Sequence, residues 1–183
     1  MRELADAARI RQFMRELGRA ARRPARVYFT GGASAVLAGW RPSTIDIDLK
    51  LVPEDDIVLR AIPALKESLQ INVELAAPDD FIPVPEGWEG RSRFIAQEGH
   101  LTFLDYDLLA QALAKIERGH VQDTADVHTM IDRRLVRADA LRAGFAAIAP
   151  FLYRYPALDP ATFKAAVDEQ IQRASISGSI GDR

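Results

Sequence analysis

The amino-acid sequence predicts an α/β (α+β) protein, with a small mixed sheet flanked by helices in its first part and a helical C-terminal half. Short runs of β-branched and aromatic residues, bounded by glycine and proline, recur up to residue 105 and are typical of strands. Helical spacings of apolar residues lie between these runs. Beyond residue 105 only the helical spacing remains, so strands and helices are predicted to separate along the chain.

The length of the chain fits one domain. With 183 residues, the chain can bury most of the apolar surface that its unfolded form exposes. We expect a single domain over residues 1–176, with a core at about 26–105 and a helical part at about 106–176. The Ser- and Gly-rich residues 177–183 are predicted to form a flexible tail.

The composition excludes several classes of protein. Cysteine is absent, which excludes disulfides, thiolate metal sites and a cysteine nucleophile. No apolar run approaches the ~20 residues of a membrane-spanning helix, so we expect a cytoplasmic protein with no membrane partner. The formal net charge of −2 argues against a general nucleic-acid-binding surface.

Each element of the first part follows from a local pattern. A helix is predicted over residues 4–17, where apolar residues recur at helical spacing. The β-branched and aromatic run 26–30 is predicted to be a strand that stops at a Gly-Gly turn. The run 44–51 alternates strictly, which predicts a second strand. The other predicted elements are a short helix at 33–38, a helix at 57–69, a strand at 71–75, a Pro- and Gly-rich loop at 78–90, and a hairpin of 93–96 with 101–104.

The helical half is predicted from apolar spacing alone. Its helices are expected at residues 106–117, 123–133, 138–148 and 160–173.

The turn at Gly31-Gly32 is a candidate phosphate cradle. Without side chains, the two residues let backbone N–H groups approach phosphate oxygens, the following helix directs its positive end there, and Ser34 can donate a hydroxyl hydrogen bond. The alternative interpretation is an ordinary turn between a strand and a helix.

Two aspartates of the alternating strand form a candidate metal site. Asp46 and Asp48 lie on one face, roughly 6–7 Å apart along the strand. Two adjacent carboxylates repel each other, and a hard Mg²⁺ ion relieves that repulsion while it bridges phosphate oxygens. The alternative is a half-exposed strand with an acidic outer face, although aspartate is depleted in strands.

These residues resemble the signature of the DNA polymerase beta superfamily of nucleotidyltransferases, which is Gly-Gly or Gly-Ser followed by an Asp-x-Asp flanked by apolar residues. Thr30 to Ser34 match the first part, and Ser43 to Leu49 match the second. The sequence is similar to small bacterial proteins related to abortive-infection nucleotidyltransferase toxins, which carry Ser or Thr just before Asp-x-Asp, as Thr44 does here. The resemblance implies a nucleotidyltransferase fold, Mg²⁺ (or Mn²⁺) at Asp46 and Asp48, and nucleotide binding at Gly31, Gly32, Ser34 and Thr44.

The same resemblance implies a role for a charged segment of the helical half. That subgroup has a lysine and a downstream aspartate, to which Lys115 with Asp126 or Asp123 is similar. In this interpretation Lys115 contacts the triphosphate, Arg118 assists, and the aspartate orients the lysine or the acceptor. The alternative is an exposed helix with charges at i, i+3 spacing.

A third carboxylate on a neighbouring strand is also implied by the resemblance, where it completes the metal site and accepts a proton. Glu74 is the candidate, and Asn72 on the same face is the other. Asn72 is neutral and cannot act as a base.

The function predicted from these residues is transfer of a nucleoside monophosphate from a nucleoside triphosphate to a hydroxyl acceptor. The expected acceptor is RNA, in particular transfer RNA, or else a protein or a small molecule. The resemblance also implies toxin-like action with an antitoxin as partner. A homodimer is a further expected assembly. The alternative is a catalytically weak or inactive module of the same fold that binds nucleotide or a partner.

Overall fold

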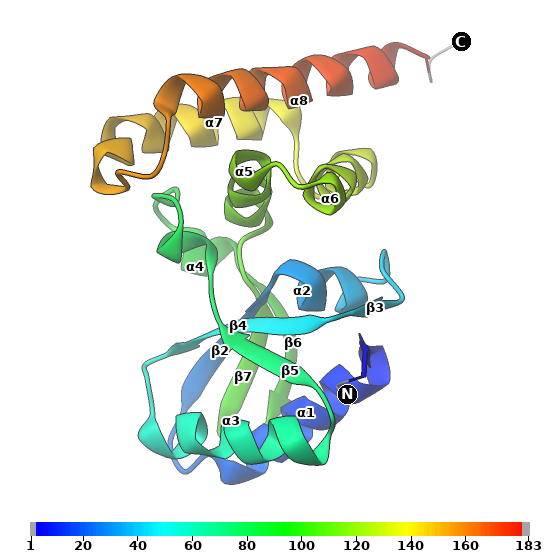
Figure 1. Cartoon of the computed structure of the whole chain (residues 1–183), viewed down its shortest axis with the longest axis vertical. Coiled ribbons are helices and arrows are strands. Elements are labelled where there is room, and N and C mark those ends of the chain that lie inside the picture. The colour runs from blue at the N-terminus through cyan, green and yellow to red at the C-terminus, as the bar shows by residue number, and fades with distance from the viewer. Residues whose placement is uncertain (1–2, 181–183) are drawn as a thin grey trace. The chain divides into compact units, whose positions relative to one another are not determined.

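A five-stranded mixed sheet forms the centre of one part of the chain, and helices form the other (Figure 1). The computed structural model describes residues 3–180, and the side chains of residues 3–174. The chain divides into unit 1, Met1–Ala77 with Ser92–Tyr106, and unit 2, Pro78–Arg91 with Asp107–Arg183. The predicted fold class is confirmed. That residues 1–176 form a single domain stays a prediction.

Unit 1 contains the sheet and the helices that pack on it. Its elements are β1 (Ala5–Asp6), α1 (Ala7–Ala20), β2 (Ala25–Thr30), α2 (Gly31–Leu37), β3 (Ser43–Thr44), β4 (Asp46–Val52), α3 (Asp56–Ser68), β5 (Asn72–Leu75), β6 (Arg93–Glu98) and β7 (Leu101–Asp105). The strand order is β5-β4-β2-β7-β6, and β1 pairs with β3 in a separate two-stranded sheet. β2 pairs antiparallel with β4 and parallel with β7, whereas β4 pairs parallel with β5.

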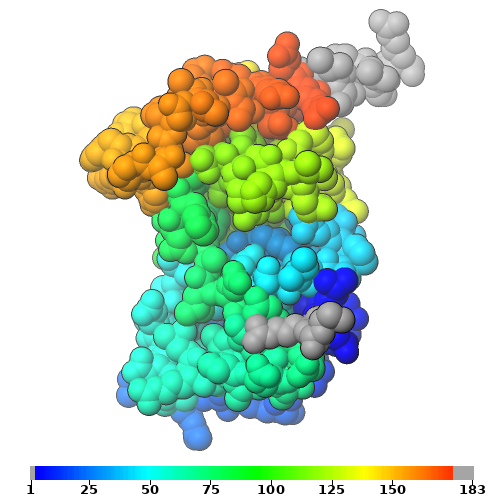
Figure 2. Space-filling view, viewed as in Figure 1, coloured from blue at the N-terminus to red at the C-terminus, as the bar shows by residue number. Residues whose placement is uncertain are grey.

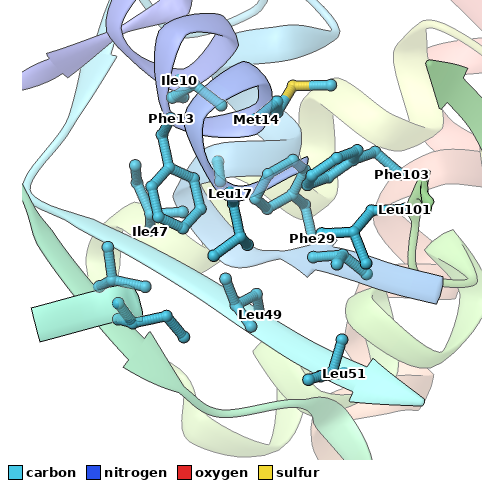
Figure 3. Close-up of a cluster of buried hydrophobic side chains, with 14 of the residues drawn as sticks. Ile10, Phe13, Met14, Leu17, Phe29, Ile47, Leu49, Leu51, Leu101 and Phe103 are labelled. Atoms are coloured by element: carbon cyan, nitrogen blue, oxygen red, sulfur yellow. The ribbon is translucent and has the colours of Figure 1, made fainter. Parts of the chain in front are cut away.

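The apolar core of unit 1 lies between α1 and one face of the sheet. Phe13 and Leu17 of α1 are fully buried, and they point toward Phe29, Ile47 and Leu49 of the central strands (Figure 3). Each such side chain contributes about 1.5–3 kcal/mol through the apolar surface that it removes from water. Because side chains alternate along β4, this packing directs the intervening residues of β4 to the opposite face.

The turn between β6 and β7 approaches α1 so closely that a side chain is excluded there. A Cβ on Gly18 would lie 2.7 Å from Cβ of Glu98 and 2.8 Å from its carbonyl carbon, both shorter than a van der Waals contact. Glycine at residue 18 therefore lets the hairpin pack directly on the end of α1.

Unit 2 is helical. Its helices are α4 (Trp88–Arg91), α5 (Leu108–Arg118), α6 (Val121–Asp132), α7 (Ala138–Ile148) and α8 (Pro160–Ile180), with 3-10 turns at Pro78–Asp80 and Ala149–Arg154. The orange and red atoms of α8 form an unbroken surface with the yellow-green atoms of α6 in Figure 2, in agreement with the packing of α8 on α5, α6 and α7. Phe145 and Phe163 meet edge to face at 5.0 Å between ring centroids.

The loop predicted at residues 78–90 is held to the start of α5 by one arginine. Arg91 donates to Oδ2 of Asp107 through Nε at 3.0 Å and Nη2 at 2.8 Å, and to the carbonyl oxygens of Pro85 and Glu86. Asp107 also caps α5, because its side chain accepts from the N–H of Leu109. Trp88 lies half-buried in α4.

Several boundaries differ from the sequence-based expectation. The first helix starts at Ala7 instead of residue 4, because Asp6 caps it by accepting from the N–H of Arg9 at 2.9 Å. The last helix continues to Ile180, beyond the predicted end at residue 173. The rest of the predicted tail, residues 181–183, lies outside the described residues. Among the described helices, none combines the length and the apolar character that a membrane crossing requires.

Candidate functional site

A glycine bend joins β2 to α2 and lies directly against the acidic strand β4. Gly31 has a φ of +58°, in the left-handed region that glycine adopts without steric cost. A Cβ on Gly31 would lie 2.6 Å from Oδ2 of Asp48, and a Cβ on Gly32 would overlap Oγ1 of Thr44. Glycine is therefore required at residue 31 by the backbone conformation and at residue 32 by the side chain of Thr44, and the carboxylate of Asp48 lies next to the bend.

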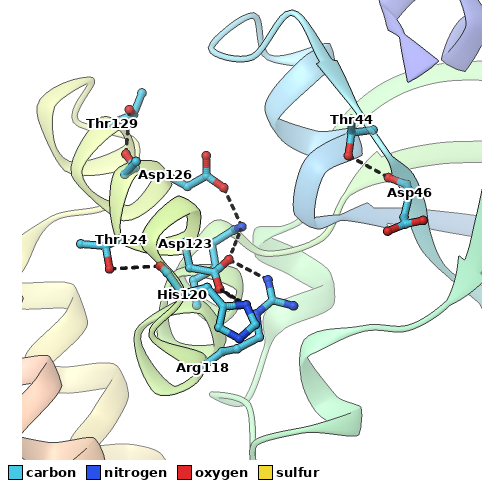
Figure 4. A network of polar contacts seen from close by, with 10 residues as sticks. Thr44, Asp46, Arg118, His120, Asp123, Thr124, Asp126 and Thr129 are labelled. Atoms are coloured by element: carbon cyan, nitrogen blue, oxygen red, sulfur yellow. Dashed lines mark hydrogen bonds and ion pairs between the residues drawn. The ribbon is translucent and has the colours of Figure 1, made fainter. Parts of the chain in front are cut away.

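The two aspartates of β4 share the face opposite the apolar core. Asp46 and Asp48 are half-buried and alternate with buried residues such as Ile47. The antiparallel register pairs Asp48 with Thr30, the last residue before the bend. The hydroxyl of Thr44 donates to the carbonyl oxygen of Asp46 at 3.0 Å (Figure 4). This hydrogen bond holds the residue pair before β4 to the first residue of the strand.

Asn72 connects the two acidic strands. The parallel register pairs Asp46 with Asn72 and Asp48 with Glu74. Nδ2 of Asn72 donates to Oδ1 of Asp46 at 2.7 Å and to Oε1 of Glu74 at 3.1 Å. Glu74 is exposed to solvent. The structure thus brings both candidates for the third position to the acidic face, with the amide of Asn72 between two carboxylates.

The donor set of this face is that of a hard divalent cation. Carboxylate oxygens are the ligands that Mg²⁺ prefers. Within residues 3–180, no group of three or more His, Cys, Asp or Glu side chains is arranged to hold a metal ion. Mg²⁺ is commonly held by one or two carboxylates together with substrate phosphates. Asp46 and Asp48 therefore suit a cation that is bound jointly with a nucleotide, and the metal itself stays a prediction.

Ser34 is fully buried, and its hydroxyl donates to the carbonyl oxygen of Phe29 at 3.0 Å. This hydrogen bond links α2 to the end of β2, and the Ser34 hydroxyl also interacts with the carboxylate of Asp105. Donation from Ser34 to a phosphate would compete with these interactions, and it stays a prediction.

Asp105 is a buried acid beside the bend that the sequence analysis did not select. Its side chain is 8% exposed and lies 3.2 Å from Nη2 of Arg93, while Oδ1 has no hydrogen-bond partner among the described residues. Burial raises the pKa of Asp105, although hydrogen bonding with Ser34 and the charge of Arg93 act in the opposite direction. The signal that could have found it is an aspartate at the end of a strand, where this residue type is depleted.

Arg41 also lies at the bend, and no sequence pattern pointed to it. A Cβ on Gly32 would lie 3.5 Å from Nη1 of Arg41. The backbone at this arginine is held by α2, because the N–H groups of Trp40 and Arg41 donate to the carbonyl oxygen of Ala35 at 3.0 and 3.3 Å. A guanidinium group is thereby placed beside the glycines.

In unit 2, the lysine and aspartates singled out from the sequence form one buried network. Nζ of Lys115 lies 2.7 Å from Oδ2 of Asp126 and 3.3 Å from Oδ1 of Asp123, and Lys115 is 5% exposed. Arg118 makes a two-nitrogen contact with Asp123 at 2.6 and 2.7 Å (Figure 4). Burial alone would raise the pKa of Asp123, but Arg118 and Lys115 outweigh it and lower that pKa.

This network joins α5 to α6 through charges that compensate one another. Both carboxylates contact the amine of Lys115, and that an aspartate orients this lysine or the acceptor stays a prediction. Contact of Lys115 or Arg118 with a triphosphate stays a prediction.

A family model matches most of the chain. A family model described as "Nucleotidyltransferase of unknown function (DUF6036)" matches residues 6–154, which include the glycine bend, the aspartates of β4 and the network of α5 and α6. No curated protein and no solved structure matches the chain.

Proposed function

We propose, since this chain belongs to the family of nucleotidyltransferases of unknown function (DUF6036), that it transfers a nucleoside monophosphate from a nucleoside triphosphate to a hydroxyl acceptor with the help of Mg²⁺. The observation that carries the proposal is the contact between Gly31 and the carboxylate of Asp48, which joins a bend free of side chains to an acidic strand face. We also propose that the family belongs to the DNA polymerase beta superfamily, whose signature the residues from Thr30 to Leu49 resemble.

In the proposed reaction, the acceptor oxygen forms a bond to the α-phosphorus of the nucleotide. The bond between that phosphorus and the oxygen leading to the β-phosphate breaks, and pyrophosphate leaves with the electron pair. The proton of the acceptor hydroxyl goes to the carboxylate of Glu74, which is exposed to solvent on the face of β5 that continues the acidic face of β4.

The residues of β4 and the bend would divide the work between charge and position. Asp46 and Asp48 would hold Mg²⁺ or Mn²⁺, which when bound neutralises phosphate charge and orients the phosphate oxygens. The backbone N–H groups at Gly31 and Gly32 would donate to the non-transferred phosphates. Asn72 would keep Asp46 and Glu74 at a fixed separation through its two hydrogen bonds.

For the acceptor we propose an RNA, with transfer RNA as the first candidate, and a toxin-like role that an antitoxin would restrain. The support is the resemblance of the Thr44-x-Asp46-x-Asp48 segment to the toxin-related nucleotidyltransferases. If this is correct, induced expression arrests bacterial growth, and Asp46→Asn abolishes the arrest. Normal growth on expression of the wild type would contradict the toxin role.

The proposed reaction is tested by incubating the purified protein and a cell extract with nucleoside triphosphates that carry a labelled α-phosphate. We expect label on a macromolecule, with loss of labelling in Asp46→Asn and retention in Arg26→Gln, an exposed residue at the start of β2 that serves as the control. Treatment with ribonuclease or protease then identifies the acceptor class.

A second candidate, a nucleotide-binding module without efficient turnover, is favoured by one observation. The amide of Asn72 occupies an oxygen of Asp46 and an oxygen of Glu74, and a cation that used these oxygens would have to displace it. Binding of nucleotide without transfer of label to any acceptor would support this module and contradict the transferase.

A further inference from the structure

Arg41 places a positive charge at the glycine bend, beside the acidic face of the proposed site. Two ionised aspartates and one divalent cation cancel in charge, so the acidic face leaves the negative charge of a triphosphate uncompensated. Sites that bind phosphates supply cations or N–H donors to them. We infer that the guanidinium of Arg41 binds the non-transferred phosphates of the nucleotide at the glycine bend; this inference rests on the proposed function.

The position of Arg41 beside the glycine bend favours this role. A Cβ on Gly32 would lie 3.5 Å from Nη1 of Arg41, and a Cβ on Gly31 would lie 2.6 Å from Oδ2 of Asp48. The guanidinium and the carboxylate thus flank two consecutive glycines, with the cation beside the second and the anion beside the first. A phosphate chain bound at the bend would meet the metal-binding carboxylate and the arginine together.

The backbone that carries Arg41 is held in place before any ligand binds. The chain turns at Gly39, which has a φ of +79°, and the carbonyl oxygen of Ala35 then accepts from two consecutive N–H groups, the second of which belongs to Arg41. Three residues later Thr44 lies in β3, which pairs antiparallel with β1. Because the backbone at Arg41 is held on both sides, binding of a ligand would have to order only the side chain of Arg41 and not its backbone.

Arg41 suits a phosphate ligand at the bend better than Lys50, which lies on β4 near the aspartates. Lys50 shares the face of Asp48 because it lies two residues further along β4. The register pairs Lys50 with Tyr28, two residues before Thr30, so Lys50 lies about 7 Å further from the bend along the strand. A guanidinium also presents a planar set of donors that matches phosphate oxygens, whereas an ammonium is a point charge. Lys50 is therefore the matched control for Arg41.

Calorimetric titration with Mg²⁺-ATP, and with Mg²⁺ plus inorganic tripolyphosphate as a probe without a base, tests the inference. We expect Arg41→Gln to bind both ligands about 10- to 100-fold more weakly than the wild type, as for loss of a hydrogen bond between charged groups. Arg41→Lys should recover part of the affinity, and Lys50→Gln should bind within about threefold of the wild type. The affinity of the wild type should also fall more steeply with added salt than that of Arg41→Gln.

The outcomes separate this inference from the proposed function. If the wild type binds Mg²⁺-ATP and Arg41→Gln binds it equally well, the role of Arg41 is wrong and the proposed function stands. If the wild type binds neither ligand, both are wrong. A loss in Lys50→Gln as large as that in Arg41→Gln would also overturn the assignment. If Arg41→Gln unfolds at a lower urea concentration than the wild type, its weaker binding is not informative and Arg41→Lys becomes the test. Wild-type affinity and wild-type salt dependence in Arg41→Lys would overturn the role of the guanidinium.

Discussion

Replacing Gly32 by alanine should destabilise the protein by a collision that can be calculated. The new Cβ would overlap Oγ1 of Thr44 and lie 2.7 Å from its Cβ, where carbon atoms need about 3.5–4.0 Å. Overpacking of this kind costs about 1–3 kcal/mol. Thr44 is 8% exposed and donates to Asp46, so turning away would cost a further ~0.5–1.5 kcal/mol. Urea denaturation of Gly32→Ala should therefore show a loss of about 1.5–4.5 kcal/mol in the free energy of unfolding.

A double-mutant cycle isolates this collision from other effects of the substitution. Thr44→Gly removes both atoms that the new Cβ meets, so Gly32→Ala should cost less in that background by about 1 kcal/mol or more. Gly90→Ala is the control, because a Cβ there meets no atom within 4 Å, and it should not destabilise. Additive effects of the two substitutions, or wild-type stability of Gly32→Ala, would refute the assignment of Thr44 as the neighbour that requires glycine.

Two further predictions concern buried charges. Lys115→Met leaves Asp126, whose side chain is 2% exposed, without its cation, so we expect the free energy of unfolding in urea to fall by about 3–5 kcal/mol. The fall should be much smaller when Asp126→Asn is already present. Equal losses in both backgrounds would contradict the pairing. Because burial raises the pKa of Asp105 above its ordinary 3.8, its contribution to stability is complete below about pH 4 and is lost as the pH rises through the raised pKa. Asp105→Asn should therefore gain stability relative to the wild type between about pH 4 and pH 7, and a shift in the opposite direction would disprove the effect of burial.

The fold could be predicted from the sequence where periodicity was strong. The alternation predicted over residues 44–51 holds from Asp46 onward, where β4 has one buried face and one half-buried face. It fails at Ile45, which is exposed between β3 and β4. The two-residue strands β1 and β3 could not be predicted, because they are defined by pairing between residues about 40 positions apart and not by a local pattern. The helix boundary at Ala7 depends on the side chain of Asp6, for which the sequence offered a competing start at residue 4.

In the candidate site, too, the sequence shows the residue types and their order, whereas the contacts between residues far apart in the chain depend on the fold. The contact of Gly31 with Asp48 connects two motifs whose residue types and order are visible in the sequence. The position of Arg41 depends instead on a turn after α2, and the ion pair of Asp105 with Arg93 depends on strand register. The bridge that Asn72 makes between Asp46 and Glu74 likewise depends on the parallel pairing of β4 with β5. These relations arise only when the sheet is assembled.

The central claim is that the aspartates of β4 and the glycine bend together bind a metal–nucleotide complex. Calorimetric titration of Mg²⁺-ATP and Mg²⁺-GTP into the wild type and into an Asp46→Asn, Asp48→Asn double variant tests it directly, because the amide side chains keep the size of the acids and remove their charge. We predict measurable binding of at least one of these nucleotides by the wild type and none by the double variant at equal concentrations. Equal affinity in the two proteins would contradict the claim.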